Sequence, residues 1–207
     1  MADGYIPPLR YHFLTRFYDL LCSIIGLGDK FRKDLLSKAA LPSKGKLLDI
    51  GCGTGIMTRL YKTKYHNLEV TGLDPDMQAL RIAKSKALQN NLKIKYIHGS
   101  AEKLPFPNES FDVITTTLAI HHLKTPQKIA AFREMYRILR KGGRLIVTDF
   151  GKPKGLLMTM LMWIPLYIEE GKDNYEGKIP LFIKQAKFRN IRLSRAKRNI
   201  DFIEAIK

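Results

Sequence analysis

The sequence predicts an α/β fold in which helices cover both faces of a mostly parallel, seven-stranded sheet. From residue 46 onward, short β-branched or leucine-rich segments alternate with longer helical patterns, which is typical of βαβ units. A glycine-rich turn follows the first of these segments directly. At 207 residues the chain is long enough for one substantial core and too short for a second full domain. We therefore expect one domain, residues 1–207.

The hydrophobic pattern places the elements of this sheet. Parallel strands are expected at residues 46–50, 68–74, 93–98, 111–117 and 144–150. Helices are expected between them at residues 54–64, 76–89 and 126–139. Gly142 and Gly143 follow the last helix in the position of a C-cap, which predicts that it ends there.

Two flanking parts complete the domain around a core at residues 45–150. The first part, residues 1–44, is a helical extension with an aromatic-rich helix at 9–25 and a second helix that Asp29 caps. The second part, residues 151–207, begins with an apolar run. It is then expected to contain a polar loop at 171–177, a short helix near 180–186, and an antiparallel edge hairpin of strands at 190–194 and 200–206.

The charge balance is strongly basic. Lys and Arg outnumber Asp and Glu by 36 to 19, which gives a net charge of +17 and a positive surface potential over large areas. Such a surface suits nucleic acid, an anionic membrane or an acidic small molecule, and it also occurs without any ligand. The composition alone does not choose among these.

The cysteines and the chain's apolar segments indicate a cytoplasmic protein. Only Cys22 and Cys52 occur, and Cys52 lies in the glycine-rich turn, where a disulfide would obstruct the backbone. The first eight residues hold Asp3 and two prolines rather than the pattern of a signal peptide. The longest apolar run, residues 156–168, is interrupted by Pro165 and falls short of the ~20 residues of a transmembrane helix.

The strongest motif is the segment 47–55, Leu-Leu-Asp-Ile-Gly-Cys-Gly-Thr-Gly. It is a hydrophobic strand that ends in an acidic residue and a glycine-rich turn, at the sheet edge where open α/β folds bind ligands. A dinucleotide site has glycine at the sixth position of G-x-G-x-x-G, but counting from Gly51 that position is Ile56. The spacing therefore disfavours a nucleotide-dependent oxidoreductase.

A second acidic residue ends the next strand. Asp74 follows Gly51 by 23 residues, close to the offset of ~20 at which a carboxylate accepts hydrogen bonds from ribose hydroxyls. The alternative role for an acid at this point is a helix N-cap, which suits Asp76 better. Asp74 is the predicted ribose ligand.

With these motifs the sequence resembles the class I S-adenosylmethionine-dependent methyltransferases, in the ubiquinone/menaquinone-biosynthesis-like branch (methyltransferase type 11). The resemblance spans about residues 45–150 and rests on four blocks, which are highly specific only together. These are residues 47–55, residues 72–76, residues 99–106 with Phe111-Asp112-Val113-Ile114, and residues 139–145. The resemblance implies a Rossmann-like fold and S-adenosyl-L-methionine as cofactor.

The resemblance also implies roles for individual residues. Asp49 and the turn residues Gly51, Cys52, Gly53 and Gly55 would surround the amino acid end of the cofactor. Asp74 would bind the ribose. The remaining cofactor contacts implied by position are Pro75 and Met77 over the adenine, Ser100, Ala101 and Glu102 along its edge, and the backbone carbonyls of Thr117 and Leu118 at the methionyl amine.

Two further groups of residues have competing interpretations. His121 and His122 lie where the acceptor would meet the methyl group, so either could orient or deprotonate it, although both are also common scaffolding in the family. Tyr11 and Tyr18 belong to an extension that is similar to the family's lid, and a ring near the sulfonium would be favoured by cation–π attraction. An aromatic stripe can equally be core. Asp112 opens its strand away from the ligand edge and is expected to be structural.

The predicted function is methyl transfer to a small, quinone-like or lipid-like acceptor. A sulfonium methyl is already activated, so the reaction requires chiefly alignment with the acceptor, and we expect no metal. The methionine-rich run after residue 155 suits a hydrophobic acceptor, or simple packing. The basic tail, residues 184–198, leaves an RNA or other polyanion substrate open, and peripheral contact with an anionic membrane as well. A non-catalytic cofactor-binding subunit is the other alternative.

Overall fold

The computed structural model describes residues 28–153, 171–197 and 199–207. The expected helix at 9–25, with Tyr11 and Tyr18, and the apolar run at 156–168 lie outside the described residues. The described strands are β1 (Lys44–Ile50), β2 (Asn67–Asp74), β3 (Lys95–His98), β4 (Phe111–Thr117), β5 (Leu139–Phe150), β6 (Arg189–Lys197) and β7 (Ile200–Ile206).

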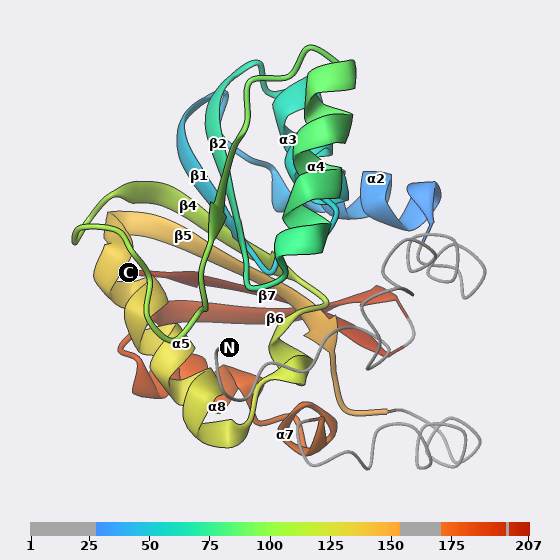
Figure 1. The fold of residues 1–207 in the computed structure, drawn as a ribbon. Helices are drawn as coiled ribbons and strands as arrows, with labels where there is room; N and C mark the ends of the chain where they lie inside the picture. The colour runs from blue at the N-terminus through green and yellow to red at the C-terminus, as the bar shows by residue number, and fades with distance from the viewer. Residues whose placement is uncertain (1–27, 154–170, 198) are drawn as a thin grey trace.

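Within the described part of the chain these strands form one seven-stranded sheet in the order β3-β2-β1-β4-β5-β7-β6 (Figure 1). The first five strands pair in parallel, whereas β7 is antiparallel to both of its neighbours, β5 and β6. Both the mostly parallel sheet and the antiparallel edge hairpin are therefore confirmed.

Helices cover both faces of the sheet. The described helices are α2 (Asp29–Ala39), α3 (Ile56–Lys64), α4 (Met77–Gln89), α5 (Thr125–Ile138), α7 (Lys172–Tyr175) and α8 (Ile179–Gln185), with a short 3-10 helix, η4 (Ile120–His122). Figure 1 shows α3 and α4 on one face and α5 and α8 on the other. The two faces have separate apolar cores, and central residues such as Leu47 and Leu48 of β1 are fully buried between them.

Several elements begin or end one to three residues from the expected positions, and three sequence assignments differ in kind. Gly142 and Gly143 do not cap α5, because Leu139 is already extended and both glycines lie inside β5. They instead accompany a register shift between β4 and β5, where Gly142 takes a positive φ of 75°. Asp29 is the first residue of α2 and its cap is Gly28, with no side-chain hydrogen bond. The expected polar loop at 171–177 contains α7.

Asp112 has the expected structural role at the start of β4. Its carboxylate accepts a hydrogen bond from the Lys46 amide at 2.7 Å and forms an ion pair with Arg140 at 2.7 Å. These contacts hold the amino end of β4 to β1 and β5, on the edge of the sheet opposite the glycine-rich turn.

The sheet order creates a switch point between β1 and β4. The chain proceeds outward from β1 to β2 and β3 on one side, and from β4 to β5 on the other. Ligands of open α/β sheets bind outside the carboxyl ends of the strands at such a point. Among the described helices, none is both long and apolar enough to cross a membrane.

Candidate functional site

The glycine-rich turn after β1 is a tight loop that has one open side. Gly51, Gly53 and Gly55 have positive φ angles of 70°, 52° and 73°, which favour glycine. A Cβ atom at Gly51 would collide with Ala119, and one at Gly55 would lie 2.6 Å from the Tyr96 hydroxyl oxygen. A Cβ at Gly53 would have no atom within 4 Å. The loop is thus packed on both flanks and accessible to a ligand at Gly53.

Cys52 faces the protein and not the open side of this loop. Its thiol is buried with the core beneath α4, and a Cβ on Gly72 of β2 would come within 2.8 Å of the sulfur. Burial raises the pKa of the thiol well above its ordinary range, so the sulfur is not a thiolate. Among the predicted cofactor residues, Cys52 can therefore contribute backbone groups only.

Asp74 ties the end of β2 to the glycine-rich turn. One carboxylate oxygen accepts a hydrogen bond from the Gly53 amide at 2.7 Å, and the other accepts one from the Asp76 amide at 2.8 Å. Burial raises its pKa to about 6 in spite of these two amides, so the carboxylate is mostly ionised at neutral pH. Each oxygen has capacity for a further donor, which fits the predicted ribose hydroxyls.

Asp76 is the N-cap of α4, as expected. Its side chain accepts hydrogen bonds from the amides of Gln78 and Ala79. This cap begins α4 directly beside Asp74, which leaves the Asp74 carboxylate for the ligand edge. The sequence assignment of the two acids is consistent with this geometry.

Asp49 lies deeper than the other acidic residues of the site. It is only 2% exposed, and one oxygen accepts a hydrogen bond from the Thr115 hydroxyl at 2.8 Å. Burial, with a smaller contribution from Asp74, raises its pKa to about 7. A carboxylate held in this way can attract a cationic amine placed above the turn.

The residues predicted around the adenine lie at the ends of β2 and β3. Met77, at the start of α4, is 47% exposed and does not belong to the core. Pro75 precedes it, and the Pro75 carbonyl contacts the His98 ring at 3.0 Å. Ala101 is buried, whereas Glu102 is half-buried and accepts a hydrogen bond from Gln127 of α5 at 2.7 Å.

The chain turns sharply where β4 ends. Leu118 has a positive φ of 52°, a strained value for a residue with a side chain, and its amide donates to the Thr148 carbonyl of β5 at 2.8 Å. Thr117 and Leu118 therefore lie at the switch point, and the turn sends the chain into η4. Strain of this kind is concentrated at functional sites.

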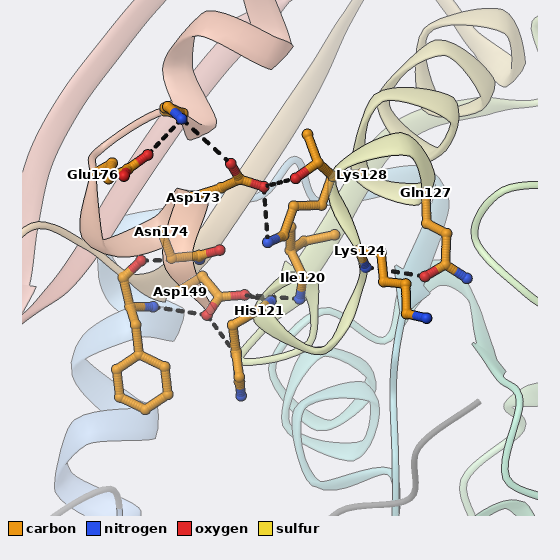
Figure 2. A network of polar contacts seen from close by, with 12 residues as sticks. Ile120, His121, Lys124, Gln127, Lys128, Asp149, Asp173, Asn174 and Glu176 are labelled. Carbon is orange, nitrogen blue, oxygen red and sulfur yellow. Dashed lines mark hydrogen bonds and ion pairs between the residues drawn. The ribbon is translucent and has the colours of Figure 1, made fainter. Parts of the chain in front are cut away.

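His121 is held by Asp149, the next-to-last residue of β5 (Figure 2). The His121 Nδ1 atom lies 2.7 Å from one carboxylate oxygen, and the amides of Ile120 and His121 donate to the other oxygen at 2.8 and 3.2 Å. The Phe150 amide adds a further hydrogen bond at 2.7 Å. Figure 2 shows the other ring nitrogen of His121 directed away from Asp149.

The electrostatics of this pair favour an ionised Asp149. Burial alone would raise its pKa, but the neighbouring His121 and the amide hydrogen bond keep it below the ordinary value. His122 packs against His121 with ring centroids 4.0 Å apart. Burial and then the proximity of His121 lower the pKa of His122 to about 3, so this ring is neutral.

A second buried ion pair supports the same region from α5 and α7. Lys128 is 0% exposed and lies 3.4 Å from the carboxylate of Asp173, which also accepts a hydrogen bond from Thr125 at 2.6 Å. The next residue, Asn174, donates to the Phe150 carbonyl at 3.1 Å. This network joins α7 to the end of β5 behind His121 (Figure 2).

Asp149, Lys128 and Asp173 were not predicted from the sequence. For Asp149 a signal exists, because it stands near the end of a strand, as Asp49 and Asp74 do. For Lys128 no such signal exists, since a lysine within a helix is usually exposed. Among the described residues, no cluster of three or more His, Cys, Asp or Glu side chains could hold a metal ion.

The fold and this site define a Rossmann-like, S-adenosylmethionine-dependent methyltransferase domain. Residues 47–143 match the family model of the methyltransferase domain, and this part of the chain belongs to that family. The match covers the glycine-rich turn, Asp74 and the two histidines, and it ends just before the main part of β5.

Curated relatives support this family. The chain is 33% identical over 157 residues to a demethylmenaquinone methyltransferase of Thermotoga maritima, a match that covers 72% of this chain and 66% of the relative. It is 29% identical to the enzyme of the same name from Lactiplantibacillus plantarum, over 94% of this chain and 93% of the relative. It spans 59% of a ubiquinone/menaquinone biosynthesis C-methyltransferase of Pseudomonas paraeruginosa, so several relatives are considerably longer than their matched part.

Solved structures show the same fold at lower identity. The structure of Haemonchus contortus phosphoethanolamine N-methyltransferase 2 in complex with S-adenosyl-L-methionine is similar with a TM-score of 0.78 and 18% identity, over 99% of this chain and 59% of that one. A SAM-dependent methyltransferase of Methanosarcina mazei has a TM-score of 0.69 and 20% identity, over 83% of this chain and 96% of that one.

Proposed function

We propose that this protein transfers a methyl group from S-adenosylmethionine to a ring carbon of a small quinone-like acceptor in its reduced, hydroxylated form. The observation that supports this best is the arrangement of two sites at one sheet edge. The glycine-rich turn and Asp74 suit the cofactor, and the His121–Asp149 pair lies one strand end away, with His121 on η4 after β4 and Asp149 on β5. The names of the relatives favour the quinone-like acceptor.

The residues present fit the cofactor. The open side at Gly53 admits a ligand against the backbone, and the Asp74 carboxylate offers acceptors for the ribose hydroxyls. We assign Asp49 and the carbonyls of Thr117 and Leu118 to the methionyl amine, and Met77 with residues 100–102 to the adenine. Tyr11 and Tyr18 lie outside the described residues and stay predictions, as does the division of the chain into a lid, a core and a substrate-side part.

His121 is the proposed general base. Because its Nδ1–H donates to the Asp149 carboxylate, the Nε2 atom carries the lone pair and can take the proton of an acceptor hydroxyl. Loss of this proton raises the electron density at the neighbouring ring carbon, which is the atom to be methylated. When bound, S-adenosylmethionine would supply an activated sulfonium methyl for in-line transfer to that carbon, with S-adenosylhomocysteine as the leaving group. The methylated carbon then releases its hydrogen as a proton, which restores the aromatic ring. His122, buried and neutral, packs against His121 and is not assigned a proton-transfer role.

The setting of the reaction is part of the proposal. A cytoplasmic location suits a chain with two cysteines, one of which is the buried, unreactive Cys52. The proposed partner is a small molecule. Methylation of RNA, and cofactor binding without catalysis, are alternative outcomes of the experiment below.

The first experiment is calorimetric titration with S-adenosylmethionine and, separately, with NAD. We expect saturable binding of S-adenosylmethionine only, and a Kd about 10–100-fold weaker in Asp74→Ala, because buried hydroxyls lose a charged acceptor. Asp112→Ala removes an acid at the opposite sheet edge and is the matched control, with little change in Kd. Absence of binding by a folded wild-type protein would refute the proposal. Methyl transfer to a reduced, short-chain demethylated quinone then tests the acceptor.

A further inference from the structure

The buried ion pair between Lys128 of α5 and Asp173 of α7 is costly for the fold. Lys128 is 0% exposed and Asp173 is 4% exposed, with 3.4 Å between the ammonium nitrogen and the carboxylate. Removing both charges from water costs free energy that their attraction seldom recovers, and apolar side chains of similar volume are often at least as stabilising. The stability of the fold therefore gives no reason for a charged pair at this position.

The side chains that α7 buries are both polar. This helix has four residues, and the two buried ones are Asp173 and Asn174. A helix this short is not stable alone, and its cap residue, Gly171, makes no side-chain hydrogen bond. Asp173 attaches α7 to α5, and the Asn174 amide donates to the Phe150 carbonyl of β5 at 3.1 Å. Because hydrogen bonds are directional, these contacts fix the orientation of α7 as well as its position.

The contact between Asn174 and Phe150 continues to the proposed base, His121. Phe150 packs edge-on against His121, with ring centroids 4.8 Å apart and an interplanar angle of 76°. The Phe150 amide also donates to Asp149, the carboxylate that holds the His121 ring. Figure 2 shows the network from Asp173 and Asn174 to Asp149 and His121. A displacement of α7 would therefore change how Phe150 and Asp149 hold this ring.

Lys128 also lies near the second histidine of η4. Burial, and then the proximity of His121, lower the pKa of His122 to about 3. Lys128 makes a smaller contribution in the same direction, so its charge acts on this ring through space. An apolar residue at position 128 would not make that contribution. The ion pair thus borders both histidines, directly beside one and through α7 behind the other.

We propose that the Lys128–Asp173 pair is a positioning element for His121, which docks α7 so that Asn174 and Phe150 hold the His121 ring toward the acceptor. This role rests on the proposed function, because His121 is the base assigned there. Lys128 is fully buried and does not touch the acceptor, so its effect passes through the orientation of His121. Small displacements of a positioned group lower a rate strongly. Cofactor binding uses the ends of β1 and β2 and is spared.

The test replaces the pair by apolar side chains of similar size in Lys128→Met/Asp173→Leu, and separately removes the link to β5 in Asn174→Ala. The double variant should fold with a Tm within about 5 °C of the wild type, because it leaves no unpaired charge buried. Each variant should lower kcat about 10–100-fold, while the Kd of S-adenosylmethionine changes less than about twofold. The triple variant should lose little more than the worse of the two, since all three substitutions interrupt one chain of contacts.

The matched control is Arg140→Met/Asp112→Asn, which removes the 2.7 Å ion pair at the opposite ends of β4 and β5 and should leave kcat unchanged. A second measurement needs no turnover. The Phe150 ring shifts the NMR signals of the His121 ring protons, because the two rings are in contact. Both Lys128→Met/Asp173→Leu and Asn174→Ala should therefore move these signals, which His121→Gln identifies by their loss.

Three results would overturn the inference: wild-type kcat in the folded double variant, unchanged His121 signals in Asn174→Ala, or losses of kcat that multiply in the triple variant. The proposed function fails separately, if the wild-type protein binds S-adenosylmethionine but transfers no methyl group to a reduced, short-chain quinone. In that case moved His121 signals would still support the positioning role of the pair, because they report packing and not turnover. Unmoved signals in an active enzyme would contradict the positioning role alone.

Discussion

Asp49 is a single residue whose burial in the site lowers the stability of the fold. Its ordinary pKa of 3.8 is raised to about 7 by burial, so the folded protein holds a proton that the unfolded chain has lost. Between about pH 4 and pH 7 the folded state binds more protons, and stability falls as the pH rises. Above pH 7 the full cost of the buried charge is present.

Asp49→Asn should therefore raise the Tm at pH 8 by a few degrees, because the amide keeps an oxygen for the Thr115 hydroxyl and carries no charge. The gain should shrink toward zero near pH 4. Thermal denaturation between pH 4 and 8 measures this, with Asp76→Asn as the control, since Asn is an equally good N-cap. A loss of Tm that is the same at every pH would show that the hydrogen bond outweighs the buried charge.

Asp149 fixes the orientation and tautomer of His121. A substitution of Asp149 should therefore change the rate of methyl transfer and not the affinity for the cofactor. Asp149→Asn should lower kcat about 10²–10⁴-fold while the Kd of S-adenosylmethionine changes less than about twofold. Besides Asp149, the His121 ring contacts the rings of His122 and Phe150, with centroids 4.0 and 4.8 Å away.

Steady-state kinetics across pH 5–9 tests this expectation. His121→Gln should lose as much kcat as Asp149→Asn, and His122→Gln should lose less. If His122→Gln were the more damaging variant, or if Asp149→Asn chiefly weakened cofactor binding, the assignment of His121 as the base would be wrong.

At the scale of elements, the glycine-rich turn permits a comparison of two neighbouring glycines. Both Gly51 and Gly53 have positive φ, so an alanine at either position costs about 1 kcal/mol of backbone strain. At Gly51 the added methyl group also collides with Ala119, whereas at Gly53 it meets open space. The two alanine variants should therefore fail in different ways.

Gly51→Ala should lower the free energy of unfolding by about 2–4 kcal/mol, and Gly53→Ala by about 1 kcal/mol. Gly53→Ala should nevertheless weaken S-adenosylmethionine binding at least about tenfold, because its methyl group stands where the ligand approaches. Urea denaturation and calorimetry of both variants provide the measurements. Unchanged cofactor affinity in Gly53→Ala would place the ligand elsewhere.

The elements also show which features the sequence can predict. The strand at 111–117 is found with the same ends, since its β-branched pattern is continuous and polar residues precede it. The extra length of β5 was missed because Gly142 and Gly143 resemble a helix stop, and only pairing with β4 shows them to be part of a strand. A pattern along one segment cannot reveal such long-range pairing.

The residues of the site also divide into those that local patterns indicate and those that depend on long-range contacts. Asp74 and the glycines could be proposed as cofactor residues from the sequence alone, because that proposal depends on local spacing along the chain. The burial of Lys128 depends on Asp173, which is 45 residues away and belongs to the four-residue helix α7. No period in the sequence indicates that contact, which arises only when α7 packs beside α5 in the folded chain.

At the scale of the whole molecule, the excess of basic over acidic residues is greater on the surface than in the sequence. Of the 19 acidic residues, six are buried in the described structure, and five of these six lie in the site and its supporting network. Lys128 is the only buried cation among the described residues. Positive charges therefore outnumber negative charges by a larger ratio on the surface than in the whole sequence. The folded state must overcome the repulsion that results.

This repulsion should make the protein more stable in moderate salt. An increase from about 10 mM to about 200 mM sodium chloride shortens the Debye length from ~30 Å to below 10 Å, which screens distant repulsions first. Surface ion pairs such as Arg140–Asp112 and Arg144–Glu204 weaken as well, but each contributes less than about 1 kcal/mol. We expect Tm to rise by about 3–6 °C, where 1 kcal/mol corresponds to about 2–4 °C.

Differential scanning calorimetry at several salt concentrations measures the rise, and glucose at equal osmolarity is the control because it does not screen charge. The variant Arg189→Gln/Arg192→Gln sharpens the comparison, since it removes two like charges from one edge strand and should raise Tm most in low salt. A fall in Tm with salt would show that the ion pairs at both ends of the sheet dominate. In that case the basic surface would be balanced by local contacts and would cost the fold little.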